Sequence, residues 1–480
     1  MKRMVPLAAG HPALGFFGGR QQRRKRRRSE QQYQTSADEL AKQPHVVKQA
    51  YYDTLAKKRR MSHFQHRLGE LRDEIARIER KYANPPPRAP EARSRGLTFR
   101  HIEEWLTGEE VETPFGRHFE TEKRYEPHRR HGSADIGALA DLPGDLLDEL
   151  SGGAILRVPP KEWAFLDTET TGLAGGAGTC AFLIGIGYIA RDGFRVRQFF
   201  MRGYSEEASV LDAVARRLAQ FRVLITYNGR AYDQPLLEAR YRWRRTRSPF
   251  GALQHLDLLH GARRLWKLRF ESCRLVDLEN RILGVERQGD MPGALIPYVY
   301  FEYLRTRLAV HLLPVFQHNA TDILSLACLT AIVPHAFRGP GGLPLRHGAE
   351  MAGIAAWLKE TGEMERARAL FRRAVDAGLP DELLFRVLWD IAVIERRLGY
   401  EDTAIQIWND LAGSPNPFRV RALEELAKHY EHRVKDLARA LEFTQAARAL
   451  ADSPGRERRE ARLAKRAKAA AKKRPAAPLR

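Results

Sequence analysis

Short apolar runs separated by polar turns dominate the middle of the chain. Four of these runs predict buried β-strands: residues 164–167, 181–190, 194–201 and 223–227. Between the second and third runs lies Arg191-Asp192-Gly193, which is typical of a hairpin turn. Residues 208–220 show the apolar spacing of a helix. This order of strand, hairpin, helix and strand predicts an α/β domain over residues 157–338, with a mixed β-sheet and flanking helices.

A weak helical repeat occupies residues 350–450. Apolar and small residues recur at offsets of zero, four and seven in three sets: Ala367, Phe371 and Ala374; Ala404, Trp408 and Leu411; Ala440, Thr444 and Ala447. Gly362 and Gly399 each lie five residues before the first Ala of a set, where a turn between two helices is expected. The periods are 404 − 367 = 37 and 440 − 404 = 36 residues. The pattern resembles the tetratricopeptide repeat and predicts an all-α domain over residues 345–452, with an ordinary helical bundle as the alternative.

The terminal segments carry less pattern. Residues 1–45 are basic and polar and predict a disordered tail, and residues 453–480 predict a second one. Residues 46–156 predict a separate region, in which a helix ends at a Pro-rich linker near residues 84–90 and a small β-hairpin follows within residues 97–130.

Charge and cysteine content narrow the class of protein. The formal net charge is +22. Residues 1–28 carry nine Lys and Arg without an acid, and residues 456–480 carry eleven against two Glu. This surplus favours a polyanionic partner, nucleic acid rather than a membrane, although solvated tails would look the same. No apolar run approaches the ~20 residues of a membrane span. The three scattered cysteines favour a reducing compartment, so we expect a cytoplasmic protein.

Acidic residues at three places suggest metal chemistry. Asp167 and Glu169 are two apart at the end of a predicted strand, so both side chains point to one face. Asp233 follows an apolar strand and the turn Tyr227-Asn228-Gly229. His318 and Asp322 are four apart, which places them on one face of a helix. Clustered carboxylates repel one another unless a cation lies between them, and such oxygen ligands suit Mg²⁺ or Mn²⁺.

These residues in this order resemble a known signature. Asp167-x-Glu169, Asn228-x₄-Asp233 and His318-x₃-Asp322 resemble the three motifs of the DEDD exonuclease superfamily, which has a ribonuclease H-like fold. The phrase from Tyr227 to Leu237 is similar to the second motif of family B polymerase proofreading domains. The wider pattern, with Gly289-Asp-Met-Pro-Gly293 and His318-Asn319, resembles bacterial ribonuclease H-like proteins, some of which carry tetratricopeptide repeats.

The resemblance implies a metal-dependent 3′–5′ exonuclease that uses two Mg²⁺ or Mn²⁺ ions. Its metal ligands would be Asp167, Glu169, Asp233 and Asp322, and His318 would act as general base or orient the attacking water. One feature departs from the family. His318 stands four residues before Asp322, the spacing of the family's tyrosine branch, whereas the histidine branch has five. The identity of the base therefore stays open.

Further residues are candidates for contact with a single-stranded nucleic-acid end. Thr168 and Asn228 lie within the motifs. The segment 240–247 interleaves aromatics with arginines, of which we expect four to bind nucleic acid: Arg240, Arg242, Arg244 and Arg245. A salt-bridged helix face is the alternative there. Asp257 and Asp290 are explained equally well by support of the site or by capping and turn formation.

Two other functions remain open. One is a nucleic-acid-binding scaffold whose nuclease fold is idle and whose repeats bind a protein partner. The other is a structure-specific endonuclease on the same fold. The sequence does not distinguish DNA from RNA as substrate.

Overall fold

A computed structural model describes residues 101–172, 178–338 and 345–472. The predicted N-terminal tail, the helix after it and the Pro-rich linker lie outside the described residues.

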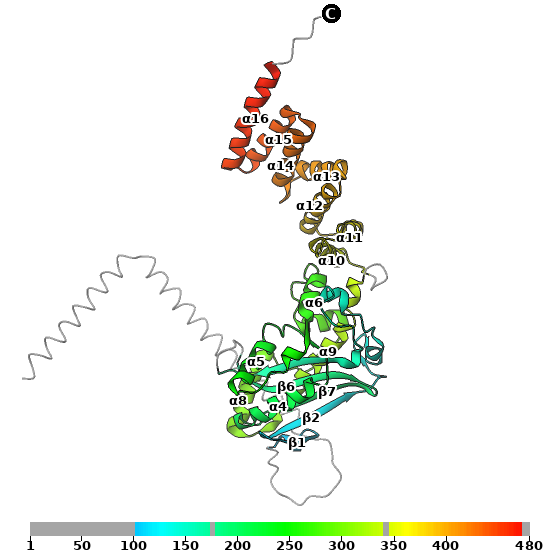
Figure 1. The fold of residues 1–480 in the computed structure, drawn as a ribbon, viewed down its shortest axis with the longest axis vertical. Helices are drawn as coiled ribbons and strands as arrows, with labels where there is room; N and C mark the ends of the chain where they lie inside the picture. The colour runs from blue at the N-terminus through cyan, green and yellow to red at the C-terminus, as the bar shows by residue number, and fades with distance from the viewer. Residues whose placement is uncertain (1–100, 173–177, 339–344, 473–480) are drawn as a thin grey trace, which may run out of the picture. The chain divides into compact units, whose positions relative to one another are not determined.

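The centre of the fold is a seven-stranded sheet with the order β1-β2-β7-β6-β5-β8-β9 (Figure 1). Its strands are β1 (Gly108–Thr113), β2 (Gly116–Tyr125), β5 (Trp163–Thr170), β6 (Ala181–Ala190), β7 (Gly193–Phe200), β8 (Val223–Thr226) and β9 (Gln254–Asp257). Strands β5, β8 and β9 run parallel, and the other pairings are antiparallel. The predicted mixed sheet is thus confirmed, together with the hairpin turn around Asp192.

The β-hairpin expected within residues 97–130 is present as β1 and β2. It does not form a separate region, however, because β2 pairs along its length with β7. The sheet therefore begins well before the predicted boundary at residue 157. The charged, alternating sequence of β2 concealed this: Glu122 on β2 binds Arg195 and Arg197 of β7 at 2.7 and 3.1 Å, so its charges are paired across the two strands.

Five longer helices surround the sheet (Figure 1): α4 (Glu207–Leu218), α5 (Asp233–Trp243), α6 (Leu258–Trp266), α8 (Ile296–Thr306) and α9 (Leu313–Thr330). Helix α9 packs on β5, β6 and β7. The segment Ala309–Phe337 around it is long and apolar enough to cross a membrane. The prediction that no apolar run approaches the length of a membrane span is therefore wrong for this segment. Its apolar window is 72% buried inside the protein, so its place as the core helix accounts for its composition.

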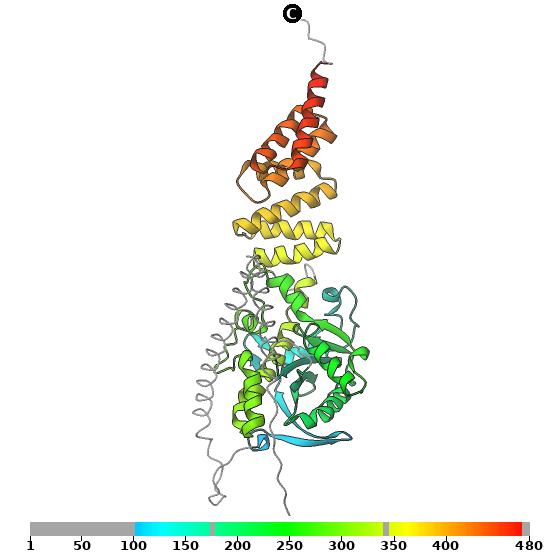
Figure 2. The same cartoon turned by 90° about the vertical axis from the view of Figure 1, so that its left-hand side faces the viewer.

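Paired helices make up the C-terminal region: α10 (Gly348–Glu360) packs on α11 (Met364–Asp376), α12 (Asp381–Arg397) on α13 (Glu401–Gly413), and α14 (Arg419–His429) on α15 (Leu437–Leu450) (Figure 2). All nine residues of the three repeated sets are buried. Gly362 and Gly399 have φ of 90° and 91° at the turns. At the third turn Lys435 takes the same left-handed conformation, φ 62°, where the sequence lacks glycine.

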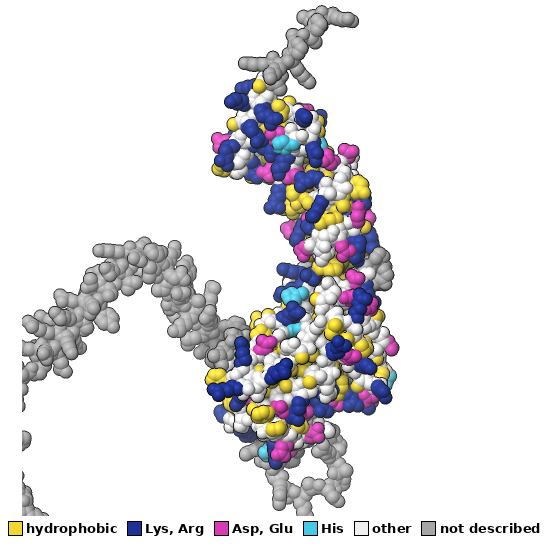
Figure 3. Space-filling model, in the orientation of Figure 1, with side chains coloured by type: hydrophobic (Ala, Val, Ile, Leu, Met, Phe, Trp, Pro, Cys, Tyr) yellow, Lys and Arg dark blue, Asp and Glu magenta, His cyan; other side chains and the backbone are white. Residues whose placement is uncertain are grey.

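The predicted C-terminal disordered tail is wrong for residues 454–472, which form helix α16 (Pro454–Lys472). Its Ala, Arg, Lys and Glu residues are strong helix formers. Leu463 is fully buried, and the buried Glu431 carboxylate accepts from Arg459, Arg462 and Arg466 at 2.8–3.0 Å. Basic side chains gather over α14 to α16 (Figure 3). Pairing with one buried carboxylate therefore orders a segment whose composition suggests a solvated tail.

The helical region packs directly on the α/β domain through α10 and α6. The buried Glu350 carboxylate of α10 accepts from Trp266 Nε1 at 3.2 Å and from Arg269 at 2.7 Å. A Cβ atom on Gly353 would lie 2.1 Å from the carbonyl oxygen of Arg264, so the helices approach closely only because this residue is glycine.

Candidate active site

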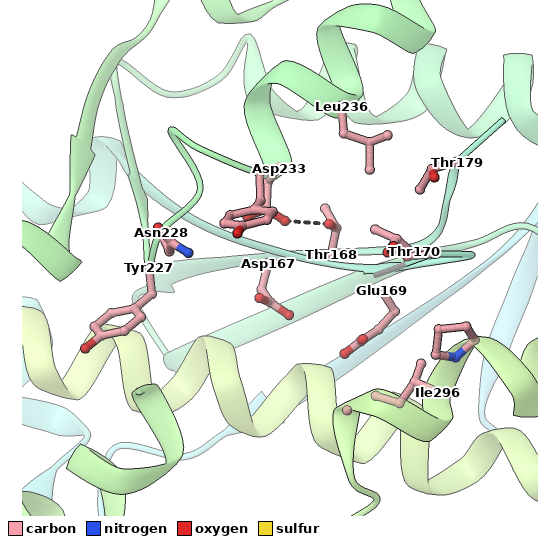
Figure 4. A pocket seen from close by; sticks show the side chains of 14 residues that line it. Asp167, Thr168, Glu169, Thr170, Thr179, Tyr227, Asn228, Asp233, Leu236 and Ile296 are labelled. Carbon is pink, nitrogen blue, oxygen red and sulfur yellow. Dashed lines mark hydrogen bonds between the residues drawn. The ribbon is translucent and has the colours of Figure 1, made fainter. Parts of the chain in front are cut away.

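Strand β5 presents the first two carboxylates. It extends three residues beyond the predicted end at Asp167, so both acids stand within the strand. Asp167 and Glu169 point to one side of β5, while Thr168 points to the other (Figure 4). There the Thr168 hydroxyl donates to the Asp233 Oδ1 atom at 2.5 Å. The pleat of β5 therefore positions the carboxylates of Asp167 and Glu169, and Thr168 between them holds the carboxylate of Asp233.

The second motif begins with a turn at Asn228, and the Asp257 side chain holds the backbone of this turn. Asn228 adopts a left-handed conformation with φ 68°, and the next residue must be glycine because a Cβ there would lie 2.5 Å from Thr226. The buried Asp257 carboxylate accepts from the Asn228 backbone N–H at 2.7 Å and caps α6 through Leu259 N at 3.1 Å. Asp257 thus fills both roles left open above. The turn starts α5 with Asp233 as its first residue.

Helix α9 brings Asn319 to Asp167. Gly185 of β6 is the register partner of Asp167, and a Cβ on it would lie 2.2 Å from the Asn319 side chain. With no side chain in the way, Asn319 Nδ2 donates to Asp167 Oδ2 at 2.8 Å. Gln198 in turn donates to Asn319 Oδ1 at 2.9 Å, which fixes the amide orientation. Asn319 follows directly on His318, and this adjacency was the one signal in the sequence for its role.

Arg287 is the centre of an ion-pair cluster that the sequence analysis missed. Its side chain is 8% exposed and binds both oxygens of the fully buried Glu279 at 2.8 and 2.5 Å. It also donates to Asp290 at 3.1 Å and to Asp322. The signal available was its position two residues before Gly289-Asp-Met-Pro-Gly293, one of the phrases that resemble the family. The fourth carboxylate is therefore held by an arginine from outside the three motifs.

His318 lies between two acids. Its Nδ1 atom is 2.8 Å from Asp290 Oδ1, and its Nε2 atom is 3.6 Å from Asp322 Oδ2. Burial lowers the pKa of His318, but the charge of Asp322 and the hydrogen bond to Asp290 outweigh this and raise the pKa to about 10. The two neighbouring acids thus favour the protonated, cationic form of the His318 imidazole. A cation cannot accept a proton, so the geometry favours an orienting role over that of a base.

Burial and mutual repulsion disfavour ionisation of the carboxyl groups that line the site. Burial, with repulsion from Asp322 and Glu169, raises the pKa of Asp167 well above its usual range. Burial raises the pKa of Glu169 to about 8 in spite of the neighbouring His318 charge, and that of Asp233 to about 6 in spite of the Thr168 hydrogen bond. Carboxyl groups that resist ionisation together in a cleft are characteristic of sites that bind a cation or perform chemistry.

A cavity of about 340 Å³ opens beside these carboxylates. Asp167, Glu169 and Asp233 line it together with five residues that extend it outward: Thr179, Tyr232, Leu236, Ile296 and Pro297. The lining therefore combines acidic side chains with the apolar or aromatic side chains of Tyr232, Leu236, Ile296 and Pro297.

The donor set fits Mg²⁺ or Mn²⁺, because four carboxylates from β5, α5 and α9 face one region and repel one another. No three acidic, histidine or cysteine side chains within the described residues are arranged to hold an ion. The reason is visible in the contacts: Asp233 turns toward Thr168, and Asp322 turns toward Arg287. Metal binding would require these two side chains to rotate, with Asp167 and Glu169 already side by side.

The arginines of segment 240–247 divide into two groups. Arg240 and Arg244 bind the buried Glu207 carboxylate of α4 at 2.5–2.8 Å, so the predicted salt-bridged face accounts for these two. Tyr241 is also buried. Arg242, Trp243 and Arg245 are exposed. Ligand contact was predicted for all four arginines, but the ion pairs leave this role to Arg242 and Arg245.

The raised pKa values predict a pH dependence of stability in EDTA. The pKa of Glu169 is 4.5 as a free group and about 8 in the fold, so the stabilisation present below pH 4.5 is lost as pH rises to about 8. The pKa of His318 is raised from 6.5 to about 10, so its contribution to stability is also lost as pH rises, between about pH 6.5 and 10. At about 1.4 kcal/mol per pKa unit, we expect Glu169→Gln to reduce the fall in unfolding free energy between pH 5 and 8 by roughly 2–4 kcal/mol.

Urea unfolding at pH 5, 6, 7 and 8 measures this difference. Identical pH dependence in wild type and Glu169→Gln would contradict the assignment of a buried, repelled carboxylate at this position. An exposed-site control such as Glu104→Gln is expected to change the slope little.

Comparison with known proteins gives two matches. Residues 164–333 match the family described as the RNase_H superfamily. Over 286 residues the chain is 32% identical to the uncharacterized protein YprB of Bacillus subtilis (strain 168), a span that covers 58% of this chain and 68% of that protein. The matched superfamily segment begins on β5 and ends just after α9, and so contains Asp167, Glu169, Asp233 and Asp322.

Proposed function

The chain belongs to the family of Bacillus subtilis YprB and carries a ribonuclease H superfamily domain at residues 164–333, and on this premise we propose that it is a metal-dependent 3′–5′ exonuclease. The observation that carries the proposal is the convergence of Asp167, Glu169 and Asp233 on one cavity, with Asp322 of the core helix behind them. Members of this superfamily are usually nucleases, and the chain's basic surplus suits a nucleic-acid substrate.

The proposed metal ligands are Asp167, Glu169, Asp233 and Asp322. Two bound Mg²⁺ or Mn²⁺ ions would supply an activated water and stabilise the leaving oxygen. Asn319 orients Asp167 for this role. Thr168 holds Asp233, and Arg287 with His318 holds Asp322, in the metal-free arrangement, and these contacts would be exchanged for the ions. His318 is proposed to orient water or substrate, and to serve as a base only if its pKa falls when the surrounding carboxylates are neutralised.

The cavity would accept the terminal nucleotide. Its carboxylate end would face the scissile phosphate, and Tyr232, Leu236, Ile296 and Pro297 would surround the base and sugar. The cavity is small, about 340 Å³, and this supports a single terminal nucleotide rather than a strand that runs through the site.

The test is hydrolysis by the full-length protein of 5′-labelled single strands of DNA and of RNA with matched sequence, in Mn²⁺ or Mg²⁺. We expect a ladder that shortens from the 3′ end one nucleotide at a time, abolished by EDTA. A 3′-phosphate block is expected to stop it. Cleavage of a circular single strand would instead identify an endonuclease.

One observation favours a second candidate, a nucleic-acid-binding scaffold. Arg287 forms an ion pair with Asp322. If this ion pair persisted when a metal is present, Asp322 could not bind the metal and the site would be inactive. Under that function the protein binds labelled strands but hydrolyses none of them in any divalent metal, and the paired helices α10 to α15 contribute the contact with a protein partner.

A further inference from the structure

Helix α5 carries two exposed aromatic rings on the face that leads away from the cavity. Tyr232, at its N-cap, is 61% exposed, and Trp243, at its last residue, is 73% exposed. Single exposed rings are normal on protein surfaces, so these two gain meaning only from their arrangement along the helix. Residues 232, 236, 239 and 243 follow one another at intervals of four, three and four, so they form one stripe along the helix.

The opposite face of α5 is fully used by the fold. Leu237 and Tyr241 are buried there, and Arg240 and Arg244 bind Glu207. Packing against the domain therefore accounts for one face of the helix and leaves the aromatic stripe without a partner among the described residues. Neither ring is needed for the core.

Charge and continuity identify the partner. Arg242, Arg245 and Arg247 flank Trp243 and are exposed, which gives the stripe positive charge at its far end. At its near end Tyr232 and Leu236 line the same cavity as Asp167 and Asp233. A ligand on the stripe thus reaches the carboxylates without leaving the surface. Aromatic rings alternating with arginines bind the bases and phosphates of single strands, because every base has a flat face for stacking.

We propose that the stripe Tyr232–Leu236–Ala239–Trp243 is the track on which the single-stranded end of the substrate enters the active site. Tyr232 stacks on a base at the cavity, and Trp243 stacks on a base further along the strand. The inference rests on the proposed function and adds the surface that guides an unpaired strand to the carboxylates. In a duplex the base faces are covered by their neighbours, so the rings would find nothing to stack on.

The helix sets the length of strand that this track requires. Tyr232 and Trp243 are 243 − 232 = 11 residues apart, so at about 1.5 Å per residue they are separated by about 16 Å along the helix. At about 3.4 Å per nucleotide of one strand, a stacked strand needs about four or five nucleotides to reach Trp243. Shorter substrates would contact Tyr232 alone.

The test measures binding of 5′-fluorescein oligothymidylates and oligouridylates of 2 to 12 nucleotides to the full-length protein in EDTA, by fluorescence anisotropy. Wild type is expected to gain affinity between about three and six nucleotides. Trp243→Ala is expected to lose that gain, which lowers affinity for the 8-mer about five- to tenfold and leaves the dinucleotide unchanged. Trp243→Phe should retain most of it.

Phe115→Ala provides the matched control, because Phe115 is a comparably exposed ring, 49%, at the β1–β2 turn. Unchanged affinity of Trp243→Ala at every length would overturn the track, as would equal binding of a blunt duplex. Hydrolysis assays separate this failure from that of the proposed function. A length-dependent gain without hydrolysis supports the track alone, and hydrolysis without the gain supports the nuclease alone.

Discussion

Replacing Asp167 by asparagine is expected to abolish hydrolysis and at the same time to stabilise the metal-free protein. Asn preserves the size of the side chain and can still accept the hydrogen bond from Asn319. It removes one buried charge that Glu169, Asp233 and Asp322 repel, so unfolding in EDTA at pH 8 should require about 1–3 kcal/mol more free energy. A metal-assisted step that loses several kcal/mol of charge stabilisation slows at least about a thousandfold.

Three measurements check this expectation: strand hydrolysis in Mn²⁺, thermal unfolding in EDTA, and the rise in Tm on adding Mn²⁺. A ligand that binds only the folded state raises Tm, so the rise should disappear in Asp167→Asn. The exposed Asp141→Asn is the control and should change none of the three. Loss of activity together with loss of stability would show that Asp167 is structural. Retained activity would exclude it from the reaction.

Replacing Arg287 by methionine is expected to produce the largest loss of stability. The change leaves Glu279, which is fully buried, without its bidentate partner, and leaves Asp290 and Asp322 less compensated. Removing one partner of a buried ion pair costs about 3–5 kcal/mol, because an uncompensated charge remains in the interior. For a domain of this size the corresponding fall in Tm is on the order of 10 °C.

Arg274→Met is the matched control. Arg274 also pairs with an acid, Asp277, at 2.8 Å, but its side chain is 80% exposed, and such pairs contribute little. The double variant Arg287→Met with Glu279→Gln should recover part of the lost stability, since the buried charge is then absent. If Arg287→Met unfolds at the wild-type temperature, the ion-pair cluster around Arg287 does not stabilise the position of α9, the helix that carries Asp322.

Much of the local structure could be predicted because periodicity is a local property. The strands at 181–190 and 193–200, the helix that carries His318 and Asp322, and the buried triplets of α11, α13 and α15 all follow from spacings of two or about 3.6 residues. The i, i+2 spacing also placed Asp167 and Glu169 on one side of β5 (Figure 4).

The errors arose where pairing across the fold outweighed local composition. The hairpin of β1 and β2 was predicted as a separate region, but the charges of β2 are paired with those of β7 in one sheet. The basic residues of α16 were predicted as a disordered tail, but three of them pair with the buried Glu431. Helix propensity alone gave a correct signal for α16, since Ala, Arg, Lys and Glu all favour a helix.

The sequence by itself therefore determined the kind of fold, the main strands and helices, and the carboxylates available for a metal. Only the tertiary structure decided which polar groups hold them. Asn319 reaches Asp167 across 152 residues because Gly185 leaves room, and Arg287 reaches Asp322 across 35. The same packing pairs Arg240 and Arg244 with Glu207 and leaves the Trp243 ring exposed. The physical reason is that charges and hydrogen bonds act between neighbours in space, and a linear pattern records only neighbours along the chain.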